Sequence, residues 1–212
     1  MKKLSFLLII VVIFCVGNLF AETSWNYGWE NGGTNFGSWN YPITENSTAQ
    51  AHSGTHSLKI TRGNSGGTPD TYIWWVNGLQ NGDTVTASIW VYASTGTNEA
   101  PRGRIWAGYA RNDDPTAYAG SAGGPSEYAG NPSWEKQTYT WTFDVGDPPR
   151  DAMVIKARVY DAEGDFIYID DTEITVSRDT AEIMNADGEV LPEPITALFL
   201  LPFLALLLRK RN

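Results

Sequence analysis

The body of this chain has no cysteine with which to build a disulfide. The 212 residues contain a single cysteine, Cys15, which lies in an apolar stretch near the N-terminus. An intrachain disulfide is therefore excluded, and the fold must gain its stability from a packed core. Between the two ends the sequence also lacks a helical apolar stripe of useful length, which argues against an all-α fold.

Basic residues are scarce outside the two terminal segments. The chain has 15 Lys and Arg against 24 Asp and Glu, and five of the basic residues but only one of the acids lie in those segments. The region between them carries a net charge of about −13. Such a surface repels nucleic acid, so a DNA or RNA partner is excluded. It suits divalent cations and neutral ligands.

The N-terminus has the pattern of a secretory signal peptide. Lys2 and Lys3 precede the apolar stretch 4–16, and Ala21 offers a small residue for cleavage. We expect residues 1–21 to be removed on export. A lipoprotein signal is not expected, because Cys15 follows a bulky phenylalanine rather than a small residue.

The last segment, 191–212, combines three features in a fixed order. The triplet Pro192-Glu193-Pro194 is followed by an apolar run and then by three basic residues at 209–211. This order resembles the PEP-CTERM sorting signal of Gram-negative bacteria. The resemblance implies recognition by an exosortase-type processing enzyme, transient inner-membrane contact through both termini, and a destination at the cell surface or in the extracellular matrix.

The apolar run of this tail is short for a permanent anchor. As a helix, residues 195–208 would extend roughly 21 Å, against a hydrocarbon core of about 30 Å. Pro202 lies inside the run and would interrupt the helix. The basic end would stay on the cytoplasmic side. An ordinary C-terminal membrane anchor remains the alternative interpretation.

Period-two alternation dominates the middle of the chain and predicts antiparallel strands. Apolar residues alternate with polar ones in several segments bounded by Gly, Pro, Asn and Asp; these segments are 56–61, 84–92, 138–143, 153–160 and a last one around 167–169. Several short strands separated by turns predict an all-β antiparallel β-sandwich. Residues 112–133 are expected to form a loop region with at most one short strand, and the acidic segment 177–190 a linker.

A second resemblance runs from about Trp25 to Val176 and predicts one domain over residues 22–176. Five pieces occur in the order found in the jelly-roll carbohydrate-binding modules of the galactose-binding-like type; they are Gly28-Trp29-Glu30-Asn31-Gly32, the strand entry at 51–60, the segment 79–92, the segment 134–143, and Phe166-Ile167-Tyr168-Ile169-Asp170-Asp171. The resemblance implies a jelly-roll sandwich in which the opening and closing strands lie side by side. It also implies a structural Ca²⁺ held by the carboxylates of Glu30 and Asp170, with backbone carbonyls completing the shell. The alternative is that Asp170 and Asp171 only end a strand and cap a turn.

Binding of a polysaccharide or another glycan is the chemistry that these features favour. Aromatic faces pack against the C–H face of a sugar ring, while polar side chains bond its hydroxyls. The candidates lie on the polar side of alternating strands, and we expect them to converge on one sheet surface; they are Trp90, Tyr92, Arg104, Trp106, Arg158 and Tyr160. Four other tryptophans, Trp25, Trp39, Trp134 and Trp141, are assigned mainly to packing.

Catalysis finds little support in the sequence. His52 and His56 have no third metal ligand in a recognisable pattern. The favoured hypothesis is a non-catalytic, exported carbohydrate-binding protein. Two alternatives stay open: a structural matrix protein that binds no sugar tightly, and a glycoside hydrolase or lyase on the same fold.

Overall fold

The computed structural model describes residues 23–64, 66–93, 102–111 and 113–192. Twelve strands and one 3₁₀ turn make up the regular structure of this part. The turn is η1 (Trp29–Asn31), and the strands are β1 (Thr23–Tyr27), β2 (Gly37–Trp39), β3 (Ile43–Ser47), β4 (Ser57–Thr61), β5 (Asp70–Asn77), β6 (Thr84–Ala93), β7 (Gly103–Ala110), β8 (Ser121–Gly123), β9 (Glu135–Thr142), β10 (Ala152–Val159), β11 (Phe166–Val176) and β12 (Glu182–Met184).

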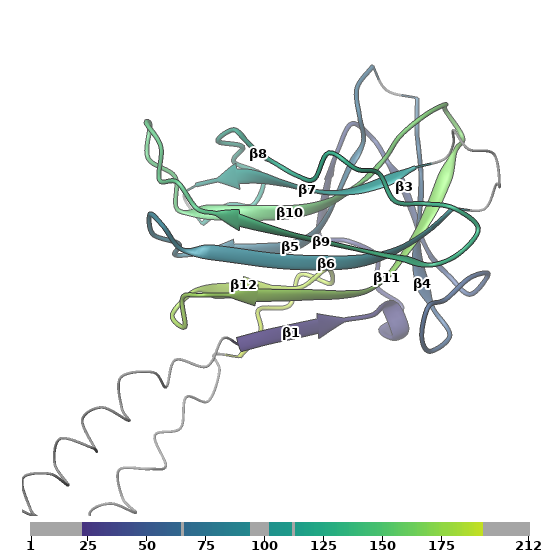
Figure 1. The fold of residues 1–212 in the computed structure, drawn as a ribbon, viewed down its shortest axis with the longest axis horizontal. Coiled ribbons are helices and arrows are strands. Elements are labelled where there is room, and N and C mark those ends of the chain that lie inside the picture. The colour runs from purple at the N-terminus through teal and green to yellow at the C-terminus, as the bar shows by residue number, and fades with distance from the viewer. Residues whose placement is uncertain (1–22, 65, 94–101, 112, 193–212) are drawn as a thin grey trace, which may run out of the picture.

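The strands form two six-stranded antiparallel sheets that pack face to face (Figure 1). Sheet A has the order β3-β4-β11-β6-β9, and β1 also pairs with β11. Sheet B has the order β12-β5-β10-β7-β8, and β2 also pairs with β5. The predicted all-β sandwich is confirmed. The expected helices of the signal peptide and of the apolar tail fall outside the described residues.

The alternation in β6 shows why the sequence forms this sandwich. Val85, Ile89 and Val91 are fully buried between the sheets. Trp90 and Tyr92 point to the other side of sheet A and stay partly exposed. Burying one apolar face of each sheet against the other provides the main driving force for folding.

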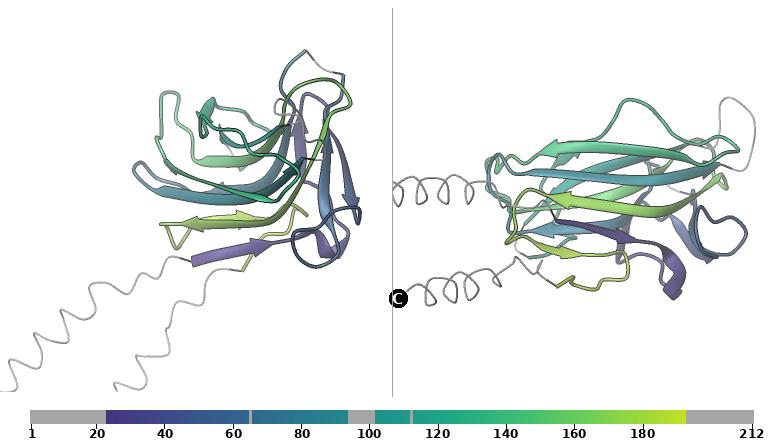
Figure 2. Two further views of the ribbon diagram at one scale, coloured as in Figure 1. Left: turned by 45° about the vertical axis from the view of Figure 1, so that its right-hand side comes forward. Right: turned by 60° about the horizontal axis from the view of Figure 1, so that its bottom comes forward.

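The opening and closing segments of the domain lie side by side, as predicted. β1 pairs with the second half of β11 from Thr23↔Val176 to Tyr27↔Thr172, and Figure 2 shows the two strands next to each other. Trp25 and Pro192 line one common pocket. The described chain therefore begins and ends at the same end of the sandwich.

The segment 177–190 differs from its sequence prediction as a linker. β12 pairs with β5 at the edge of sheet B, with Ile183 opposite Val76. Ile183 and Ala186 are buried in the core between the sheets. The acidic composition hid this strand, because only a few apolar residues in the segment carry its packing. Within the part of the chain that the structure describes, no helix has the length and apolar character needed to cross a membrane.

Candidate functional site

Four of the six predicted ligand residues come together on the outer face of sheet B. Arg104 and Trp106 lie on β7, Arg158 lies on β10, and Tyr160 follows β10 directly. The register places Arg158 opposite Arg104. The guanidinium of Arg104 donates from Nε and Nη2 to the hydroxyl of Tyr160, at 3.1 and 2.7 Å. These four side chains form one continuous surface.

The other two predicted residues lie on the opposite sheet. Trp90 and Tyr92 belong to β6 of sheet A, so the expectation that all six share one sheet surface is wrong. The ring of His52 stacks on Trp90 at 3.8 Å between centroids, and Tyr92 packs against Trp134. Alternation shows which residues of one strand share a face. It does not show which strands share a sheet.

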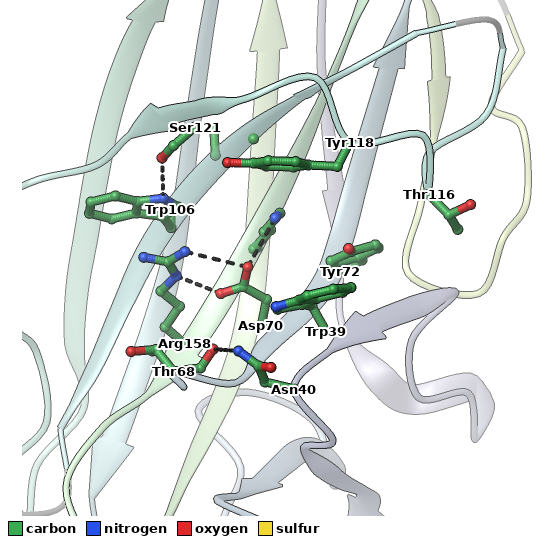
Figure 3. A pocket seen from close by; sticks show the side chains of 13 residues that line it. Trp39, Asn40, Thr68, Asp70, Tyr72, Trp106, Thr116, Tyr118, Ser121 and Arg158 are labelled. Carbon is green, nitrogen blue, oxygen red and sulfur yellow. Dashed lines mark hydrogen bonds and ion pairs between the residues drawn. The ribbon is translucent and has the colours of Figure 1, made fainter. Parts of the chain in front are cut away.

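A cleft of about 400 Å³ opens on the outer face of sheet B (Figure 3). Two of the predicted residues, Trp106 and Arg158, line it. The remaining lining residues come from β2, β5, β7, β8, β10 and the loops beside them, and they are Trp39, Asn40, Thr68, Asp70, Tyr72, Ala107, Gly108, Thr116, Tyr118, Ser121 and Lys156. Its volume lies in the usual range for ligand sites.

An ion cluster forms the floor of the cleft. The carboxylate of Asp70 accepts a hydrogen bond from Nζ of Lys156 at 2.9 Å and from Nε of Arg158 at 2.5 Å. The side chains of Asp70 and Lys156 are only 4% and 5% exposed. Such buried charges are tolerated because they are paired. Sequence reasoning missed both residues, although a lysine in the middle of the mainly apolar β10 was an available signal.

Aromatic rings frame the cleft mouth. Trp39 and Tyr118 are 63% and 62% exposed, which is unusual for large aromatic side chains. In Figure 3 both rings lie beside the ion cluster, with Trp106 on the far side. The indole Nε1 of Trp106 donates to the hydroxyl of Ser121 at 3.0 Å, which fixes the ring. The assignment of Trp39 to packing is therefore wrong for this residue.

The loop that carries Trp39 has an uncommon backbone. Asn40 and Tyr41 both have positive φ, at 57° and 52°, a region that non-glycine residues rarely adopt. Gly67 allows the close approach of a second loop, since a Cβ there would lie 2.5 Å from Nδ2 of Asn40. That nitrogen donates to the carbonyl of Thr68 at 3.1 Å. These contacts fix the backbone that follows Trp39 at the rim.

Tyr72 adds a neutral donor at the side of the cleft. Burial and the nearby carboxylate of Asp70 raise the pKa of its hydroxyl above the ordinary value. The group therefore keeps its proton at physiological pH and can donate a hydrogen bond.

The two predicted calcium ligands bind one backbone loop. Glu30 accepts hydrogen bonds from the amides of Thr55 and His56, at 2.9 and 2.8 Å. These amides lower the pKa of Glu30 to about 2. Asp170 accepts from the amides of His52 and Ser53, at 2.9 and 3.2 Å. Burial raises the pKa of Asp170 above its ordinary range.

These contacts do not fit an oxygen-lined calcium shell. Amide and hydroxyl donors already engage most of the lone pairs of both carboxylates, whereas Ca²⁺ takes six to eight oxygen ligands. No group of three or more His, Cys, Asp and Glu side chains is placed to hold a metal within the described ranges. The ion held by Glu30 and Asp170 stays a prediction.

The geometry defines an antiparallel β-sandwich with an aromatic cleft on one sheet, the architecture of a sugar-binding module. Residues 21–160 match the family model described as a carbohydrate binding domain, CBM_4_9. The chain belongs to this family. A search of curated proteins found no match.

Solved structures support the fold. The CBM22-1 xylan-binding domain of Paenibacillus barcinonensis Xyn10C shares 16% identity at a TM-score of 0.51, over 74% of this chain and 97% of that one. The C-terminal family 22 carbohydrate-binding module of Clostridium thermocellum Xyn10B shares 14% identity at a TM-score of 0.50, over 72% of this chain and 92% of that one. At these identities the similarity concerns the sandwich architecture, not the ligand.

Proposed function

We propose that this domain is a non-catalytic glycan-binding module and that the cleft on sheet B is its binding site. The observation that carries the proposal is the pairing of exposed aromatic faces at the mouth with a fixed polar floor. Family membership supports a binding module rather than a catalytic domain.

The chemistry of the cleft suits a sugar chain. Trp39 and Tyr118 present apolar faces on which pyranose rings can stack without a large entropy cost, since each side chain has only two torsions. Asn40, Thr116 and Arg158 offer polar groups for hydroxyls. The ion pair with Asp70 holds Arg158 in place before a ligand arrives, and such preorganisation improves affinity.

Paired tryptophan variants test the site. We expect Trp39→Ala or Trp106→Ala to weaken binding to a responsive polysaccharide about tenfold or more, since truncation of a central aromatic anchor commonly costs over 1 kcal/mol. Trp90→Ala is the matched control, because it removes the same side chain from the opposite sheet. Affinity electrophoresis across a polysaccharide panel gives the dissociation constants.

The result that would overturn this site is loss of binding in Trp90→Ala with Trp39→Ala and Trp106→Ala unaffected. That outcome would move the site to sheet A, where Trp90 and Tyr92 were predicted to act. Release of reducing ends from any member of the panel would contradict the non-catalytic proposal.

We also propose that the protein is exported and sorted to the cell surface or extracellular matrix by an exosortase-type system. The signal-peptide pattern at 1–21 and the triplet Pro192-Glu193-Pro194 with its apolar, basic tail support this route. Residues 1–22 and 193–212 lie outside the described part of the chain. Mass spectrometry of surface material from the native host tests the proposal, because an unprocessed C-terminus would contradict it.

A further inference from the structure

The cleft carries more positive than negative charge among its described lining residues. Lys156 and Arg158 are its two cations, and Asp70 is its one carboxylate. Both cations contact that same carboxylate, at 2.9 and 2.5 Å. Besides Asp70, Lys156 faces only the rings of Tyr72 and Tyr118 in the described contacts. The floor therefore holds one buried positive charge in excess.

A third cation lies directly beside the cleft. Arg104 bonds neutral acceptors, the hydroxyl of Tyr160 and the carbonyl of Pro125. No carboxylate of the described residues forms an ion pair with it. The strand register sets it opposite Arg158, and like charges in directly opposite positions destabilise a sheet. Both guanidinium groups lie over the Trp106 ring, at 4.5 and 4.2 Å from its centroid.

The guanidinium of Arg158 keeps a donor for a ligand. Asp70 accepts hydrogen bonds from Nε and Nη2 of Arg158. Among the described residues, no group accepts a hydrogen bond from Nη1 of Arg158. Asp114, in the exposed turn beside the mouth, bonds Thr116. Solvent screens such a charge more than the buried cations of the floor.

This local charge opposes the charge of the whole domain. The region between the terminal segments carries a net charge of about −13. A cluster of three cations with one carboxylate therefore has the opposite sign to the domain as a whole. A cleft with low-dielectric walls focuses the field of such a cluster. Guanidinium groups match the planar geometry of a carboxylate.

We propose that the cleft takes a glycan that carries carboxylates, a uronic-acid-containing polysaccharide, in preference to an uncharged one. The inference rests on the proposed glycan-binding function and names its ligand class. A uronate ring would stack at the aromatic mouth while its carboxylate meets the donors of Arg158 and Arg104. The sequence-based expectation of neutral ligands followed from the net charge alone.

The test compares each acidic polysaccharide with its own carboxyl-reduced form. Polygalacturonate, alginate and hyaluronan are titrated beside their reduced derivatives and beside neutral xylan. We expect at least tenfold tighter binding of one acidic form than of its reduced partner at low salt. The preference should shrink as NaCl is raised, because salt screens the attraction.

A charge variant tests the residues. Arg104→Gln should weaken binding of the acidic form at least threefold more than it weakens binding of the carboxyl-reduced form. Lys136→Gln is the matched control, since it removes one positive charge from sheet A, where Lys136 pairs with Glu173 at 2.5 Å. Near-ultraviolet circular dichroism verifies that both variants are folded.

The outcomes separate the two proposals. Equal binding of acidic and reduced forms, or binding of xylan alone, overturns the uronate proposal and leaves glycan binding standing. Binding of dextran sulfate without any carboxylated glycan also overturns it, in favour of sulfate. No binding to any polysaccharide overturns the proposed function and the inference with it.

Discussion

Asp70 is the residue on which the cleft depends most. It is nearly inaccessible to solvent, and it is the carboxylate that Lys156 and Arg158 share. Asp70 escaped the sequence analysis because β5 is buried along almost its whole length and shows no alternation. Lys156 lies in the predicted strand 153–160, but the alternation there gave no sign that its charge would be buried. Arg158 was found because it lies near the end of β10, where alternation with Ala157 and Val159 is visible.

Removing the charge of Asp70 should destabilise the fold strongly. Asp70→Asn leaves two buried cations without their partner, and breaking such a cluster costs about 3–5 kcal/mol of unfolding free energy. Glu45→Gln is the control, because the Glu45–Lys59 pair spans 3.6 Å with Glu45 62% exposed; such pairs are worth about 1 kcal/mol or less. Urea denaturation measures both, and equal losses would contradict the account of the ion cluster.

Glu30 should make the domain more stable as pH rises from acid. Its pKa is about 2 in the fold against 4.5 for a free glutamate, so the unfolded chain binds the proton more tightly. Its contribution is complete above pH 4.5 and is lost as pH falls toward 2. Asp170, whose pKa is raised, changes the stability with pH in the opposite direction. The contribution of Glu30 must therefore be measured with a variant of Glu30 itself.

The difference in melting temperature between the wild type and Glu30→Gln measures this contribution. It should be largest above pH 5 and should shrink as pH falls to 2. Asn46→Ala is the control: Asn46 bonds the carbonyls of Trp29 and Gly33 beside Glu30 but carries no titrating group. A constant difference for Glu30→Gln would show that the amides do not hold its pKa down.

At the scale of elements, alternation located the strands with one polar face and also β10, but it missed β5. β6 and β9 were predicted closely, because each has one apolar and one polar face. β5, with the sequence DTYIWWVN, is buried along almost its whole length and shows no period of two. The cleft floor comes from β5 and β10, so its geometry could not be predicted from single-strand patterns.

The short strand β12 provides the sharpest test at this scale. If residues 177–190 belong to the sandwich, Ile183→Ala leaves a cavity in the core and should cost about 2–5 kcal/mol of unfolding free energy. Glu182→Ala on the same strand is exposed and should cost about 0.5 kcal/mol or less. Urea denaturation compares the two. A small, equal effect of the two substitutions would support the sequence-based prediction that the segment is a linker.

At the scale of the whole molecule, the sequence predicted the sandwich and the meeting of its first and last strands, because the order of five motifs carried that information. It could not predict which sheet would hold each aromatic residue, since that depends on strand order across the fold. The net charge was also a poor guide to the cleft. The net charge summed over the chain is negative, whereas the fold places three cations, Arg104, Lys156 and Arg158, on one face of sheet B.

Calcium removal tests how the two ends of the domain are joined. Glu30 lies in η1, directly after β1, and Asp170 lies in β11, so an ion between them would tie the opening of the fold to its closing strand. Both carboxylates instead have amide donors of the 52–56 loop as partners. From these hydrogen bonds we expect the melting temperature to stay within about 1 °C when EDTA is added, because a site without affinity gives no linkage.

Differential scanning calorimetry on protein purified without chelator makes the measurement, with Ca²⁺ added back in a third sample. A fall of several degrees in EDTA that Ca²⁺ reverses and Glu30→Gln abolishes would establish the ion predicted from the sequence. The Asn46→Ala variant would keep such a response, because its side chain contacts neither carboxylate. The chelator response therefore decides whether an ion or a loop of backbone amides closes the domain.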